Sequence, residues 1–88
     1  MNVPSPETTE KVEMISYNVM GELYRAMIRF PKFNSPHEGY AVILEELDEA
    51  WEEIKKNDTK RAIEEMTQVA AMAIRFLVDC GEGANTHE

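Results

Sequence analysis

The sequence predicts an all-α fold: three amphipathic helices that form a helical bundle completed by homo-oligomerisation. In three segments apolar residues recur every three or four positions, and two short breaks separate these segments. No stretch alternates apolar and polar residues for long enough to indicate a strand. We expect a single helical domain over residues 1–81, with helices at about 6–30, 36–57 and 59–80, and a disordered tail over 82–88.

The first helix is predicted from an N-cap residue, a stripe of apolar residues and a proline that ends the helix. Ser5 is a suitable N-cap and Pro6 suits the first helical turn. Pro31 ends the pattern, because the residue before a proline disfavours helical geometry. The apolar stripe between them consists of Val12, Ile15, Val19, Leu23, Met27 and Phe30.

The second helix has the clearest start signal. Ser35, Pro36 and Glu38 form a capping box, in which the serine and the glutamate each satisfy a backbone N–H of the first turn. The apolar stripe that follows consists of Tyr40, Ile43, Leu44, Leu47, Trp51 and Ile54. Core packing is the plainer interpretation of the two aromatic residues, and base stacking at a pocket mouth is the other.

The third helix begins after a short turn in which Asn57, Asp58 or Thr59 can act as the N-cap. Gly81 suits the position after its end. Its stripe consists of Ile63, Met66, Val69, Ala70, Ala73, Phe76, Leu77 and Cys80. Because these stripes are broader than three helices need, we expect a homo-oligomer, a dimer or a tetramer. A monomeric three-helix bundle is the alternative.

Composition excludes several classes of partner. The net charge of −8 disfavours nucleic acid and anionic membranes, both of which attract basic surfaces. No apolar run is long enough for a transmembrane helix. The chain has one cysteine, Cys80, which fits a reducing compartment, so we expect a cytoplasmic location.

Acidic residues form a strip beside the apolar stripe of the second helix. At 100° per residue, Glu46, Glu49 and Glu53 fall on one side, whereas Glu45 projects away from them. Glu65 and Gln68 form a polar pair on the third helix. If the two helices pack antiparallel, these oxygen donors face one another and suit Mg²⁺ or Mn²⁺. A solvated acidic surface without a metal is the alternative.

The order of these residues resembles the MazG-type all-α nucleotide pyrophosphohydrolases, over about residues 37–80. That family carries E-E-x-x-E on one helix and E-x-x-D on the next. Glu45, Glu46 and Glu49 match the first motif, and Glu65 matches the start of the second. Gln68 stands where the family has aspartate.

The resemblance implies a helical bundle that assembles through other subunits and hydrolyses a nucleoside triphosphate, NTP or dNTP, to the monophosphate and pyrophosphate. Carried over, Glu46, Glu49 and Glu65 would be Mg²⁺ ligands and catalytic residues, with Glu45 assisting them. Gln68 would supply an amide oxygen, which brings no charge and cannot act as a base. The alternative is a catalytically impaired helical module that binds a nucleotide or metal, or serves as an oligomeric adaptor.

Overall fold

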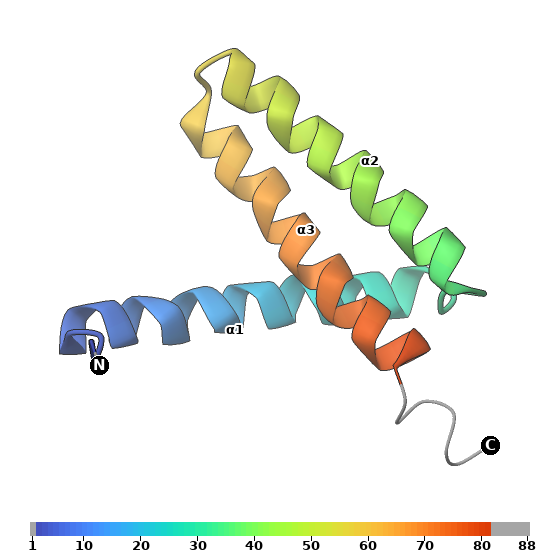
Figure 1. Cartoon of the computed structure of the whole chain (residues 1–88), viewed down its shortest axis with the longest axis horizontal. Helices are drawn as coiled ribbons and strands as arrows, with labels where there is room; N and C mark the ends of the chain where they lie inside the picture. Colours follow the sequence, from blue (N-terminus) through green and yellow to red (C-terminus); the bar gives the residue numbers. More distant parts are fainter. Residues whose placement is uncertain (1, 82–88) are drawn as a thin grey trace.

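The computed structural model describes residues 2–81, and within this range the chain forms helices joined by short connections, without strands. It contains α1 (Pro6–Arg29), α2 (Pro36–Lys55) and α3 (Thr59–Cys80), as Figure 1 shows. The predicted all-α class is therefore confirmed. α2 ends before the expected residue 57, because Asn57 has a φ of 62°, a left-handed conformation that cannot continue a helix. The tail predicted over 82–88 lies outside the described residues.

Side-chain caps start all three helices. The side-chain oxygens of Ser5, Ser35 and Asp58 accept backbone N–H groups one turn into their helices, at 3.2, 3.2 and 3.1 Å. The capping box differs from the prediction in its second half. The Glu38 carboxylate accepts the backbone N–H of Asn34 at 2.7 Å, so it fixes the residue before the cap.

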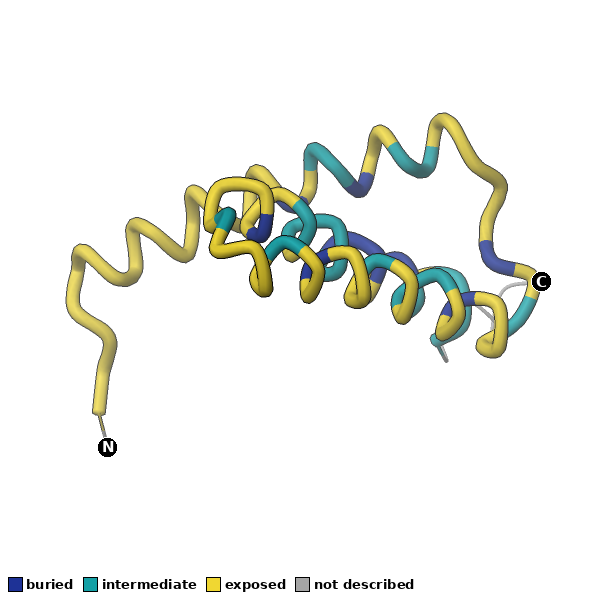
Figure 2. Tube along the Cα trace, turned by 90° about the horizontal axis from the view of Figure 1, so that it is seen from above, coloured by how far each residue is buried: buried dark blue, intermediate teal, exposed yellow. Residues whose placement is uncertain are grey.

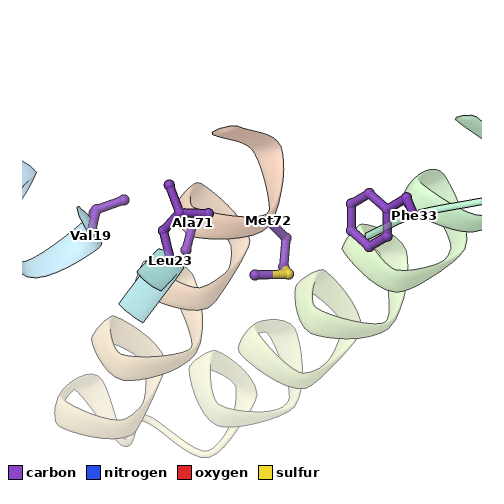
Figure 3. Packing of buried hydrophobic residues seen from close by; sticks show 5 residues of the cluster. All are labelled: Val19, Leu23, Phe33, Ala71 and Met72. Atoms are coloured by element: carbon purple, nitrogen blue, oxygen red, sulfur yellow. The ribbon is translucent and has the colours of Figure 1, made fainter. Parts of the chain in front are cut away.

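α2 and α3 form an antiparallel hairpin, and α1 crosses α3 (Figure 1). The core lies at this crossing: Val19 and Leu23 of α1 pack with Ala71 and Met72 of α3 and with Phe33 of the α1–α2 connection (Figure 3). Residues 6–18 of α1 extend beyond the crossing and are exposed throughout (Figure 2). One chain therefore buries only part of its apolar stripes.

Small residues determine which side of α2 faces α3. A Cβ atom on Gly39 would lie 2.7 Å from Cδ2 of Phe76 and 3.0 Å from Cδ2 of Phe33, so only glycine permits this approach. Ala50 is fully buried. The predicted core stripe of α2 lies to one side of this contact, and Tyr40 and Trp51 stay 64% and 54% exposed. In the single chain these two aromatic residues are therefore not packed in a core.

A buried ion pair attaches the end of α1 to α3. Arg75 is 3% exposed, and its guanidinium donates to the carbonyl oxygens of Ala26 and Phe30 at 3.1 and 2.8 Å. It also donates to Asp79 Oδ2 at 3.1 Å, and the same oxygen accepts the backbone N–H of Phe33 at 2.9 Å. Arginine thus satisfies carbonyls at the C-terminal end of α1 and holds the connection to α2 in place.

None of the helices described over residues 2–81 is both long enough and apolar enough to cross a membrane.

Candidate metal centre

Three carboxylates converge where the acidic strip of α2 faces α3. Glu46 and Glu49 lie one turn apart on α2, and the antiparallel hairpin brings Glu65 opposite them. One oxygen from each of the three lies within 4.8 Å of the others. Glu46 and Glu65 are half-buried, and Glu49 is exposed. The short α2–α3 turn therefore produces the facing arrangement that the helical projection predicts.

The three carboxylates disfavour one another's charge. Burial raises the pKa of Glu46 to about 6, and the charges of Glu49 and Glu65 add to this rise. Burial also raises the pKa of Glu65, followed by the charge of Glu49 and a hydrogen bond with it. A divalent cation between the three oxygens would reverse these effects, since an opposite charge favours the ionised carboxylate.

The donor set consists of oxygen atoms alone. Carboxylate oxygens suit hard cations such as Mg²⁺ and Mn²⁺, whereas thiolate and imidazole ligands favour zinc and copper. Glu53 continues the same strip, but its carboxylate pairs with Lys56 at 3.8 Å. The residues present therefore fit a small, hard divalent ion held by Glu46, Glu49 and Glu65.

The side chain of Gln68 forms a hydrogen bond with α1. Its Nε2 donates to Glu22 Oε2 at 2.8 Å, and the other oxygen of Glu22 accepts from Arg25 at 2.6 Å. These two hydrogen bonds, with that of Arg25 first, lower the pKa of Glu22. Only the oxygen of a carboxamide can act as a ligand, and the hydrogen bond through Nε2 leaves the oxygen of Gln68 available for this role.

Glu22 is a polar contact that the sequence analysis missed. It lies between the buried Val19 and Leu23 in the sequence and is half-buried. At 100° per residue, Glu22 falls beside the buried face of α1. The partner on α3 was not predictable, because the sequence does not give the angle at which α1 crosses.

A hollow of about 420 Å³ lies between the end of α1, the first half of α2 and α3, and Glu46 is the member of the converging trio that lines it. Glu45 and Glu46 line it together with Gln68. The projection directed Glu45 away from the strip, yet its exposed side chain reaches this hollow. Volumes of this size accommodate small-molecule ligands. The other lining residues are Ala26, Phe30, Pro31, Phe33, Asn34, Glu38, Val42, Met72 and Arg75.

Comparison with known proteins adds no relative: no family model, no curated protein and no solved structure matches this chain. The resemblance to the MazG-type family stays a prediction based on Glu45, Glu46, Glu49 and Glu65.

Proposed function

We propose that this chain is a Mg²⁺-dependent nucleoside triphosphate pyrophosphohydrolase of MazG type, which converts an NTP or a dNTP to the monophosphate and pyrophosphate. Mn²⁺ would substitute for Mg²⁺. The observation that carries the proposal is the convergence of Glu46, Glu49 and Glu65, whose oxygens lie within 4.8 Å of one another.

Charge and space support this proposal. A triphosphate is an anion, and an acidic chain repels it unless a divalent cation bridges the two. Glu46, one of the three carboxylates that would hold this cation, lines a hollow of about 420 Å³, in which a nucleotide has room beside the metal.

In this proposal each residue of the site has a specific role in the reaction. Glu46, Glu49 and Glu65 would hold the cation, which would supply positive charge beside the phosphate oxygens. Gln68 offers a neutral amide oxygen, oriented by its hydrogen bond to Glu22 at 2.8 Å. Glu45, which lines the hollow, would assist by orienting the attacking water. Water adds to one phosphorus as the bond to the pyrophosphate leaving group breaks.

The test is pyrophosphate release from a panel of NTPs and dNTPs with Mg²⁺, at high enzyme concentration. The wild-type chain should release pyrophosphate, and Glu46→Gln should not. Glu52→Gln is the matched control, because Glu52 lies on the same helix and pairs with Lys55 at 2.8 Å. Turnover that is equal in all three proteins would indicate a contaminant, and no release from any substrate would contradict the proposal.

A second candidate function follows from Gln68. With an amide in place of a fourth carboxylate, the site has less charge with which to hold a metal. A catalytically impaired module that binds a nucleotide or metal, or acts as an oligomeric adaptor, fits this observation. Calorimetry separates the two variants of this candidate: heat with Mg²⁺ or a nucleotide indicates a binder, and no heat leaves the adaptor.

We expect the catalytically active form to be a homo-oligomer, either a dimer or a tetramer. The support is the apolar surface that one copy leaves exposed, including Tyr40 and Trp51 of α2 and Leu77 of α3.

A further inference from the structure

The hollow of about 420 Å³ that Glu46 lines has two ends. Because α2 and α3 run antiparallel, Glu46 and Gln68 lie towards one end, and Glu38 and Arg75 lie towards the other. The interval from Glu38 to Glu46 is about 12 Å along the helix. Asn34 also lines the hollow and is hydrogen-bonded to Glu38. The part of the hollow beside Asn34 and Glu38 is termed the far end, since the candidate metal ligand Glu46 lies at the opposite end.

Two carboxamide side chains line the hollow, and each has its nitrogen against a carboxylate. Nδ2 of Asn34 donates to Glu38 Oε2 at 3.4 Å, and Nε2 of Gln68 donates to Glu22 Oε2 at 2.8 Å. An ionised carboxylate only accepts hydrogen bonds, so the NH₂ group of each amide must face it. The carbonyl oxygens of Asn34 and Gln68 are therefore the amide atoms left to a ligand.

The donors of the hollow are largely used within the chain. Arg75 is the one cationic residue among the described residues that line it. This side chain is 3% exposed, and it already donates to Asp79 and to the carbonyl oxygens of Ala26 and Phe30. Acceptors therefore predominate among the polar groups that a ligand would meet: the carboxylates of Glu38, Glu45 and Glu46 and the amide oxygens of Asn34 and Gln68.

This distribution of charge determines how a nucleotide lies in the hollow. The Glu38 carboxylate repels phosphate groups from the far end, whereas a cation held with Glu46 attracts them to the other end. The base then occupies the far end. Phe30 lines the hollow and is 58% exposed, so its ring is open for stacking. Stacking tolerates every base, so hydrogen bonds decide which base is preferred.

We infer that the far end selects nucleotides whose base carries an exocyclic amino group, namely those of adenine and cytosine. The two N–H bonds of such an amino group match two acceptors, the amide oxygen of Asn34 and the carboxylate of Glu38. Uracil has a carbonyl oxygen at that position, and this oxygen would face acceptors. The inference rests on the proposed function for the position of the phosphates, but it concerns which nucleotide binds and does not require hydrolysis.

The test compares two matched pairs of nucleotides with Mg²⁺, CTP against UTP and ATP against ITP. Within each pair a carbonyl replaces the amino group, while the sugar and the triphosphate stay the same. In calorimetry, the wild-type chain should bind CTP and ATP at least ~10-fold more tightly than UTP and ITP, as expected for one good pair of hydrogen bonds to a base edge. Pyrophosphate release from the same four nucleotides is measured in parallel.

Glu38→Gln tests the source of this preference. Its carbonyl oxygen can still accept the backbone N–H of Asn34, which Glu38 binds at 2.7 Å. Its NH₂ group would then face the Asn34 amide, which turns over and presents its own NH₂ group to the ligand. The preference for CTP over UTP should therefore be lost or reversed. Glu52→Gln is the control and should keep the preference, because Glu52 pairs with Lys55 and does not line the hollow.

Asn34→Leu is a second variant, which keeps the backbone contact with Glu38 and removes the amide oxygen. It should also reduce the preference, so the test does not depend on the folding of Glu38→Gln. Equal affinity of the wild type for both members of each pair would overturn the inference, as would the absence of binding by all four nucleotides. So would a preference that persists in full in a folded Glu38→Gln or Asn34→Leu chain. Selective binding without pyrophosphate release would contradict the proposed reaction only.

Discussion

Replacing Glu46 with glutamine should stabilise the metal-free chain at neutral pH. Folding places this carboxylate in a half-buried position beside Glu49 and Glu65 and raises its pKa from 4.5 to about 6. A raised carboxylate pKa means that the folded state resists ionisation. The ionised Glu46 carboxylate therefore lowers the free energy of unfolding. This cost has its full size above pH 6 and disappears below pH 4.5.

The size of the effect follows from the pKa. At 1.36 kcal/mol per pKa unit, a rise from 4.5 to about 6 corresponds to about 2 kcal/mol. Solvent screening at this half-exposed site reduces the expected value to about 1 kcal/mol. Glu46→Gln removes the charge and keeps the shape, so its free energy of unfolding should exceed the wild-type value by about 1 kcal/mol at pH 7.5.

Urea unfolding with EDTA, at pH 7.5 and pH 4 and at one protein concentration, measures this difference. The matched control is Glu52→Gln, because the hydrogen bond from Lys55 lowers the pKa of Glu52. This control should not gain stability. Excess Mn²⁺ should reverse the order of wild type and Glu46→Gln, since a ligand at 100 times its Kd adds about 2.7 kcal/mol to the protein that binds it.

A destabilised Glu46→Gln at pH 7.5 would refute this reasoning. So would a gain that persists at pH 4, because the wild-type carboxylate is then protonated. An equal gain in the free energy of unfolding for Glu52→Gln would also refute it. The gain would then come from the lower net charge and not from the convergence of three carboxylates.

Three further substitutions test other parts of the structure. Arg75→Met should cost about 3–5 kcal/mol in urea unfolding, because it leaves the buried Asp79 carboxylate without its cation; a loss below 1 kcal/mol would contradict this role. Gly39→Ala should cost about 1–3 kcal/mol, because its Cβ would lie 2.7 Å from an aromatic ring; an unchanged urea midpoint would contradict that packing. Gln68→Asp should lose the hydrogen bond to Glu22 and cost about 1–3 kcal/mol without metal. The same substitution should tighten Mn²⁺ binding in calorimetry, and weaker binding would place residue 68 away from the ion.

Local signals were sufficient to predict the helices and their starts. Ser5 and Ser35 act on backbone groups three residues away, and such contacts depend on sequence spacing alone. The approach of Glu46 and Glu49 to Glu65 was also predictable. A short turn forces two neighbouring helices to run antiparallel, and helical periodicity then determines which side chains face each other.

Contacts with α1 were not predictable in this way. Arg75 binds carbonyl oxygens of Ala26 and of the C-cap residue Phe30 at the end of α1, 45 to 49 positions earlier in the sequence. Glu22 meets Gln68 across a similar separation. Both contacts depend on how α1 crosses α3. Periodicity gives the face of a helix that is apolar, but not the angle at which another helix lies on it.

The apolar stripe of α2 lies beside the contact that α2 makes with α3 in the single chain. Gly39 and Ala50 are buried at the contact between α2 and α3, while Tyr40 and Trp51 remain exposed. Small residues allow two helices to approach closely, and a hydrophobicity pattern alone gives them little weight. It also does not distinguish an apolar face that packs within one chain from one that packs between chains.

Anomalous diffraction from a crystal soaked in Mn²⁺ tests the central claim most directly. The account predicts one manganese peak per chain between Glu46, Glu49 and Glu65, with a carboxylate oxygen of each residue bound to the ion. Crystals in saturating Mn²⁺ without a peak there, or with the ion bound only at other acidic residues, would contradict it.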